Sequence, residues 1–297
     1  MIGSSYGHPG ARFASNPLPG AAVAHDTPVG RSQDSARLYD RVLTLQTEAQ
    51  WRADLDVLVR SPEWLGATTV LDLGAGNGAF GRRLATRFPT KSIVALEPDA
   101  ALHALGSRAP SPPNYVYLHG GFEPGLEGFF DVLLARGVLM YMPDRRSLAT
   151  WASEHCAAAL IMNNAPDASS VSPALAHHAE LAPNSWGHPD DQRAAARDRD
   201  LVDSPRVFAD AGFVLAGSTT AITELWGYRG RVLAHHFLRA AGELVDPAAI
   251  TVDVLDDLFE WSNQDDACLT LGATWYRFRN ARTAWLSRPD DPAGAGS

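Results

Sequence analysis

The sequence predicts an α/β fold, a doubly wound and mostly parallel sheet of about seven strands with helical cap elements. Between residues 68 and 163, short apolar runs alternate with segments of helical periodicity, and this alternation is typical of parallel strands joined by right-handed crossovers. A glycine-rich turn connects the first run to the first helix. The 297 residues are 45% hydrophobic and 20% charged, which is enough for a sizeable buried core.

Seven strands and the helices between them can be placed along the chain. The first five strands are expected at 68–73, 92–96, 115–118, 130–135 and 159–162, with helices at 78–88, 100–107 and 144–155. Ser204-Pro205 then starts a helix that Gly212 ends. The remaining elements are a sixth strand, a helical segment and an aromatic, β-branched seventh strand, at 213–216, 226–262 and 274–278.

Residues 34–60 are expected to form two helices. Asp34 can cap the first, and Thr47 with Gln50 forms a capping-box pattern that begins the second. Either these helices cover the edge of the sheet or they form a lid over a bound cofactor. In the second case Tyr39 is a candidate contact to the cofactor.

The rest of the chain is expected to form one domain with two tails. Residues 34–287 would be a single domain, and its cap elements are placed at 34–66, 164–203 and 226–268. Residues 1–33, rich in Gly, Pro, Ala and Ser, are predicted to be a flexible arm or tail, and 288–297 a second tail. An ordered arm would instead lie on the active site or on a second subunit, which would allow a homo-oligomer.

Charge and cysteine content exclude several classes of partner. The net charge of −9 argues against nucleic acid, because phosphate binding requires a basic face. The two cysteines, Cys156 and Cys268, are not spaced as zinc ligands and fit a reducing cytoplasm. The N-terminus does not resemble a signal peptide, and no apolar run approaches the roughly 20 residues that span a bilayer. We therefore expect a cytoplasmic protein that binds neither nucleic acid nor a membrane.

The glycine-rich turn, residues 70–80, indicates a nucleotide-like cofactor. Its glycines at every second position let the chain turn sharply and let a ligand approach the backbone. The same turn satisfies a dinucleotide fingerprint, so the glycines alone do not identify the cofactor. Asp72 favours a cationic ligand, because its carboxylate would repel a pyrophosphate. Glu97, at the end of the second strand, is placed to hold the ribose hydroxyls of either cofactor.

Taken together, the motifs resemble the class I S-adenosylmethionine-dependent methyltransferases over roughly residues 68–163. The motifs that carry the resemblance are VLDLGAGNG at 70–78, LEPD at 96–99, GGFE at 120–123 and FDVLLARGVL at 130–139. The resemblance implies a Rossmann-like sheet whose last strand is antiparallel, with S-adenosyl-L-methionine as the cofactor. The implied binding residues are Asp72, Gly74, Ala75 and Gly76 at the methionine and ribose end, Glu97 at the ribose hydroxyls, Pro98, Gly121 and Phe122 at the adenine, and Ala135 and Arg136 at the methionyl segment.

Two of these positions leave alternatives open. Many relatives carry an aspartate where this chain has Gly121, and that aspartate accepts from the adenine amino group. Its absence leaves Phe122 to contribute a backbone N–H and a ring face. Arg136 is either the partner of a carboxylate on the substrate or cofactor, or a surface cation.

Methyl transfer from a sulfonium is an in-line displacement, for which the protein mainly aligns the reactants and excludes water. A hydroxyl or carbon acceptor also needs a base, and histidine is the usual choice. The candidates are His177, His178 and His188, in the long polar connection after the fifth strand. A metal site formed by His188, Asp190 and Asp191 is the less favoured interpretation, so no metal is predicted.

We therefore expect an enzyme that methylates a small-molecule acceptor at an undetermined N, O or C atom, in secondary metabolism. Four aromatic residues could line a pocket for an apolar or aromatic acceptor or could belong to the core: Trp226, Tyr228, Trp261 and Trp275. The resemblance to methyltransferases of natural-product biosynthesis covers the general layout only. The alternatives are an NAD-dependent oxidoreductase and a non-catalytic cofactor-binding protein.

Overall fold

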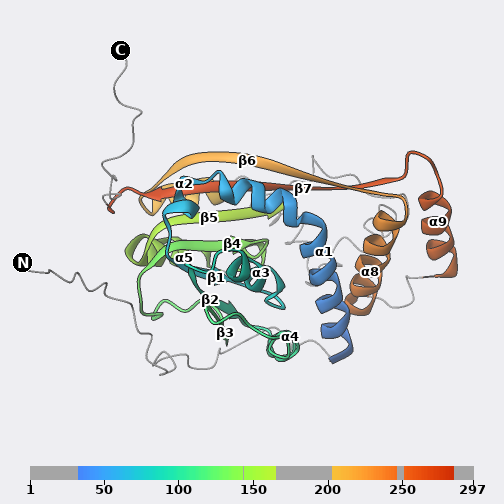
Figure 1. Cartoon of the computed structure of the whole chain (residues 1–297), viewed down its shortest axis with the longest axis horizontal. Coiled ribbons are helices and arrows are strands. Elements are labelled where there is room, and N and C mark those ends of the chain that lie inside the picture. The colour runs from blue at the N-terminus through green and yellow to red at the C-terminus, as the bar shows by residue number, and fades with distance from the viewer. Residues whose placement is uncertain (1–32, 143, 165–202, 246–250, 284–297) are drawn as a thin grey trace, which may run out of the picture.

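A computed structural model of the protein describes residues 33–142, 144–164, 203–245 and 251–283. The two tails and most of the connection at 164–203, for which the sequence makes predictions, lie outside these ranges. Within them, seven strands form one sheet in the order β3-β2-β1-β4-β5-β7-β6 (Figure 1). The strands are β1 Thr69–Leu73, β2 Ser92–Glu97, β3 Tyr115–His119, β4 Phe130–Arg136, β5 Cys156–Asn164, β6 Phe213–Trp226 and β7 Cys268–Asn280.

Strand directions confirm the predicted fold class. Every neighbouring pair among β1 to β5 is parallel, whereas β7 is antiparallel to both β5 and β6. The last strand in the chain is thus inserted between the fifth and the sixth. The helices are α1 Gln33–Val59, α2 Pro62–Gly66, α3 Ala79–Arg87, α4 Ala100–Gly106, α5 Arg145–His155, α8 Tyr228–Val245 and α9 Val252–Ser262, and residues 203–210 are also helical.

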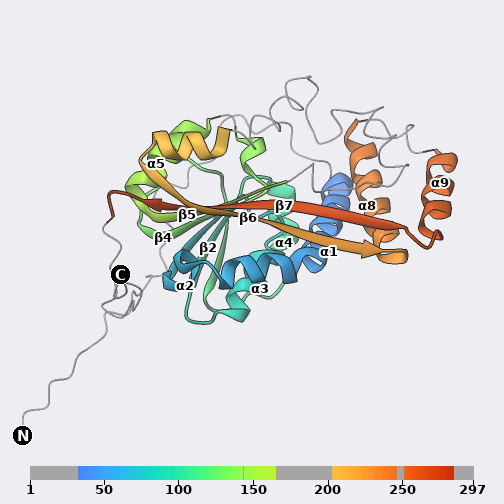
Figure 2. The same ribbon diagram turned by 90° about the horizontal axis from the view of Figure 1, so that it is seen from above.

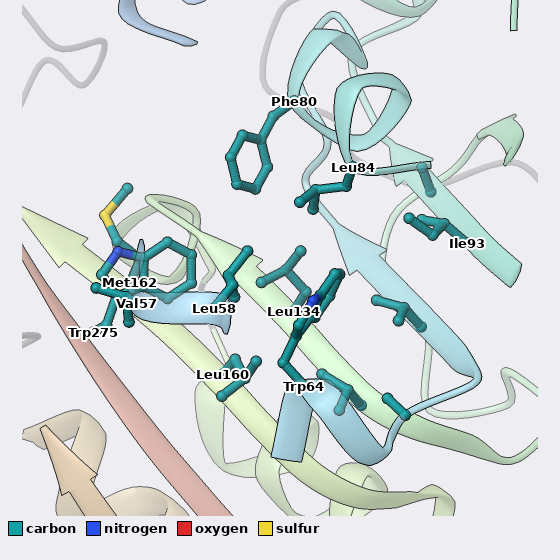
Figure 3. Packing of buried hydrophobic residues seen from close by; sticks show 14 of the residues in the cluster. Val57, Leu58, Trp64, Phe80, Leu84, Ile93, Leu134, Leu160, Met162 and Trp275 are labelled. Atoms are coloured by element: carbon teal, nitrogen blue, oxygen red, sulfur yellow. The ribbon is translucent and has the colours of Figure 1, made fainter. Parts of the chain in front are cut away.

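Helices cover both faces of the sheet, as Figure 2 shows. Side chains alternate between the faces along each strand: Val70 of β1 packs with α1, α2 and α3, and the next residue, Leu71, packs with α5. The first cluster includes the fully buried Trp64 and Trp275 (Figure 3). These two clusters hold the central strands, and hence their carboxyl ends, in fixed positions.

The expected break between two helices in residues 34–60 is wrong, because α1 is one continuous helix. Thr47 and Gln50, whose spacing suggested a capping box, are 5% and 3% exposed inside it. Gln50 accepts a hydrogen bond from Arg136 at 2.8 Å between its Oε1 and Nη2 of the arginine. Its polar group therefore serves a tertiary contact and does not cap a helix.

β6 and β7 are much longer than the sequence predicts. They pair from Phe213↔Asn280 to Trp226↔Cys268, with one irregularity between Leu215 and Gly217. Beyond Ala216, β6 interleaves Ser, Thr and Glu with apolar residues, and so lacks the continuous apolar run by which residues 213–216 were recognised.

The insertion between β6 and β7 contains α8 and α9. These helices form a third apolar cluster, in which Leu45 and Ala49 of α1 pack near Leu233 of α8. Within the described ranges, no helix combines the length and the apolar character that crossing a bilayer requires.

Candidate cofactor site

The carboxyl ends of the parallel strands meet at one edge of the sheet, around the glycine loop 74–78. Leu73, the last residue of β1, is in register with Leu96 of β2 and Ala135 of β4. The strand order reverses between β1 and β4, and ligands of open α/β sheets bind at such a point. The fold therefore gathers the predicted residues around one loop.

The glycine loop requires its glycines for two reasons. Gly74 and Gly76 have φ values of +65° and +59°, which disfavour residues with a Cβ. A Cβ at Gly74 would lie 2.2 Å from Cγ2 of Val138, and one at Gly76 would lie 2.7 Å from Cδ1 of Leu43. At Gly74 and Gly76 the loop thus forms a cradle of bare backbone, and Val138 and Leu43 pack directly on it.

Glu97 holds the loop in this conformation. Its Oε2 accepts the backbone N–H of Gly76 at 2.8 Å, and its Oε1 accepts that of Asp99 at 2.9 Å. The residue is 6% exposed. A carboxylate can accept about four hydrogen bonds, so the two bonds that orient Glu97 do not by themselves fill it.

Two tyrosines of β3 also support the loop. The hydroxyl of Tyr117 donates to the carbonyl of Gly76, and that of Tyr115 donates to the carbonyl of Gly78 at 3.4 Å. Their rings stack with centroids 6.1 Å apart. The sequence interpretation missed both residues, although their spacing of two in a strand places them on one face and could have indicated a shared contact.

Asp72 is a buried carboxyl group below the loop. It is 2% exposed, and its Oδ2 has no hydrogen-bond partner among the described residues. Burial raises the pKa of Asp72 to about 7, although the positive charge of Arg136 acts in the opposite direction. A buried acceptor with no donor is costly, so this position favours a cationic or hydrogen-donating neighbour.

Arg136 is not a surface cation, because its side chain is only 10% exposed. Its Nε donates to Oδ2 of Asp54 at 2.9 Å, and its guanidinium lies 4.7 Å from the centre of the Phe80 ring. Trp275 of β7 donates to the other oxygen of Asp54 at 3.1 Å. Asp54 therefore already pairs the charge of Arg136 within the protein. The sequence did not predict Asp54 as its partner.

The residues expected at the adenine also come together. A Cβ at Gly121 would lie 3.5 Å from Cβ of Pro98, with space for a side chain beyond it. Phe122 packs edge-on against Trp151 at 5.6 Å between ring centroids. His119 contacts the carbonyl of Pro98 through Nε2 at 3.2 Å, so it supports this part of the site.

Residues 71–153, from β1 into α5, match the profile of a family described as a methyltransferase domain. This match supports a class I S-adenosylmethionine-dependent methyltransferase for this part of the chain. The cofactor that this family implies is S-adenosyl-L-methionine.

One curated relative is similar to part of this chain. The trans-aconitate 2-methyltransferase of Deinococcus radiodurans is 35% identical over 86 residues, which are 29% of this chain and 33% of that protein. The match thus covers about a third of the relative's length.

Solved methyltransferase structures are also similar to the chain. A candidate sarcosine dimethylglycine methyltransferase from Galdieria sulphuraria is 15% identical, with a TM-score of 0.46, over 83% of this chain and 98% of its own. An N-methyltransferase from Haemonchus contortus, solved with phosphomonomethylethanolamine and S-adenosylhomocysteine, is 12% identical, with a TM-score of 0.43, over 84% of this chain and 57% of its own.

The other residues that the sequence predicts at the site differ in where they lie. Tyr39 lies in α1, the helix whose Leu43 packs on the loop. Ala135, at the end of β4, is fully buried. His177, His178 and His188, with Asp190 and Asp191, lie outside the described residues. Of the aromatic candidates for an acceptor pocket, Trp261 and Trp275 are core residues, while Trp226 and Tyr228 are exposed.

Proposed function

We propose that this chain transfers a methyl group from S-adenosylmethionine to a small-molecule acceptor. The observation that carries the proposal is the acidic surrounding of the glycine loop. Asp72 is buried beneath it and Glu97 is bonded to it. Of two cations near the loop, Arg136 is paired with Asp54, and Arg82 donates to the backbone carbonyls of Asn77 and Gly106. Two phosphates would be repelled here, whereas a cofactor with an ammonium and a sulfonium group would be attracted.

The proposed binding roles follow from position. Glu97 would accept from the ribose hydroxyls, since its carboxylate is fixed by two backbone donors beside the loop. Asp72 would stabilise the positive charge of the methionine end. Pro98, Gly121 and Phe122 would line the adenine, and the backbone of Ala135 and Arg136 would border the methionyl segment.

The cofactor, when bound, supplies a methyl group on a sulfonium, which is an excellent leaving group. The chain's own task is then to align the acceptor and to exclude water. Leu43 and Val138, which pack on the loop, supply apolar cover at this point. If the acceptor is a hydroxyl or a carbon acid, the proposed bases are His177, His178 and His188.

The proposal extends to an apolar or aromatic acceptor in natural-product metabolism. A test is incubation of the purified chain with methyl-deuterated S-adenosylmethionine and a broad panel of amines, phenols, carboxylic acids and carbon acids, followed by mass spectrometry. A product carrying the labelled methyl group supports the proposal and identifies the acceptor class. Cofactor binding without any labelled product would favour a non-catalytic cofactor-binding protein.

A further inference from the structure

Asn77, within the glycine loop, connects this loop to α1. Its side-chain nitrogen donates to the carbonyl of Asp40 at 3.1 Å, to Oδ1 of Asp40 at 2.9 Å and to Oγ1 of Thr44 at 2.9 Å. Its side-chain oxygen accepts the N–H of Ala79, at the start of α3, at 3.1 Å. Asn77 is 4% exposed, so water competes little for these bonds.

The bond to Ala79 explains only half of these contacts. It closes a local turn before α3, whose N-cap is Gly78, and a serine oxygen can close such a turn as an asparagine oxygen does. The amide nitrogen of Asn77 has no part in this turn, and its acceptors all lie on α1, between Asp40 and Thr44. The amide therefore has a separate role, which is to hold this turn of α1 against the loop.

The same turn of α1 covers the cradle. Leu43 lies between Asp40 and Thr44 in sequence, and its Cδ1 is 2.7 Å from where a Cβ of Gly76 would be. Further along α1, Asp54 and Gln50 hold Arg136 at the end of β4. Two polar attachments, one at each half of the helix, thus fix α1 over this edge of the sheet.

We propose that Asn77 is a positioning residue that keeps α1 closed over the glycine loop and so sets the rate at which the cofactor leaves. The inference rests on the proposed function, because it takes the loop to be the cofactor site. A ligand on the loop is retained while the turn from Asp40 to Thr44 stays in place. Its departure requires that turn to move, which breaks the buried bonds of the Asn77 amide.

The test is the dissociation rate of S-adenosylhomocysteine, measured by stopped-flow displacement, for the wild-type chain and three variants. Asn77→Ser keeps an oxygen for the N–H of Ala79 but cannot reach α1, and we expect dissociation about tenfold faster. Thr44→Val removes one acceptor from α1 without touching the loop, and a rise of several-fold is expected. The double variant should accelerate dissociation by less than the two single effects combined, because both substitutions break the same contact.

Asn114→Ser is the matched control. Asn114 likewise donates through one amide to three carbonyls, those of Ala85, Phe88 and Lys91 at 3.0, 3.3 and 2.7 Å, but it precedes β3 at the opposite end of the sheet. This variant should lose stability and leave the dissociation rate unchanged.

Two results would overturn the inference while leaving the proposed function intact. One is a dissociation rate within twofold of wild type in both Asn77→Ser and Thr44→Val. The other is an equal acceleration in Asn114→Ser, which would indicate a general loss of stability. If the wild-type chain bound no S-adenosylhomocysteine at all, the proposed function itself would fail, and the inference with it.

Discussion

Gly76 donates its backbone N–H to Glu97 across 2.8 Å, and this bond joins the loop after β1 to the end of β2. The carboxylate that the sequence assigns to the ribose thus also shapes the loop on which the cofactor is proposed to lie. Loss of Glu97 should therefore affect both the ligand contact and the preorganisation of the loop.

We predict that Glu97→Ala weakens the binding of S-adenosylhomocysteine by about 1–3 kcal/mol, roughly 5- to 150-fold in Kd, because charge-assisted hydrogen bonds are lost. Glu97→Gln should fall between wild type and alanine, since it retains an acceptor for Gly76. Calorimetry measures all three, and Glu127→Gln, at an exposed position, is the control. Wild-type affinity in Glu97→Ala would remove this residue from the site.

The affinity for S-adenosylmethionine should depend on pH through Asp72, whose pKa burial raises to about 7. Below that pH the carboxyl is protonated and loses its attraction for a cation, so affinity should fall as the pH decreases from 8 to 6. S-adenosylhomocysteine lacks the sulfonium charge and should show a smaller change. In Asp72→Asn the difference between the two ligands should disappear; an identical pH dependence in variant and wild type would contradict this role.

The same carboxyl should make the folded state less stable at higher pH. Its pKa is about 7 in the folded protein and 3.8 in an ordinary environment, so between these values the folded state binds more protons than the unfolded state. Its stabilising contribution is present below about 3.8 and is lost as the pH rises through 7. Thermal unfolding of the apo chain should therefore show Asp72→Asn gaining several degrees over wild type at pH 8, and less at pH 5.

Asp54→Ala should lower the free energy of unfolding by about 3–5 kcal/mol, because it leaves the Arg136 guanidinium buried without its partner. The same helix offers a matched control, the Asp56–Arg60 pair at 2.9 Å, whose side chains are 55% and 77% exposed. Asp56→Ala should cost less than about 1 kcal/mol. Urea unfolding of the two variants distinguishes them, and equal losses would mean that burial of the Asp54–Arg136 pair has no energetic consequence.

Gly76→Ala should destabilise the protein and weaken cofactor binding together. A left-handed conformation costs a residue with a Cβ roughly 1–2 kcal/mol, and the new methyl group must displace Leu43. Gly125→Ala is the control, since nothing lies within 4 Å of a Cβ there and its backbone is not left-handed. Urea unfolding and S-adenosylhomocysteine titration of both variants test this; an unaffected Gly76→Ala would show that the loop is not closely packed.

The sheet and the residues of the cofactor loop could be predicted because their signals are local. Asp72 and Glu97 stand at the ends of apolar runs, and strand ends meet at one edge in a parallel sheet. The sequence did not predict that α1 is one continuous helix. Gln50 bonds to Arg136, 86 positions away, and no residue near Gln50 in the sequence indicates this partner. For the same reason Asp54 was not recognised as the partner of Arg136.

The role of Asn77 could not be predicted either, although it lies inside the most informative motif. An asparagine in a turn is explained well enough by a bond from its side-chain oxygen to the nearby backbone, and the sequence does not show that its nitrogen faces another helix. The length of β6 and β7 depends on their mutual pairing, from Phe213↔Asn280 to Trp226↔Cys268, and the mixed polar and apolar residues beyond Ala216 do not indicate this pairing in the sequence.

The central claim is that the loop after β1 binds S-adenosylmethionine and not a pyrophosphate cofactor. Calorimetric titration of the purified chain with S-adenosylhomocysteine and, separately, with NAD tests it most directly. We predict saturable binding of S-adenosylhomocysteine that Glu97→Ala weakens, and no binding of NAD. Saturable binding of NAD, with none of S-adenosylhomocysteine, would contradict the claim.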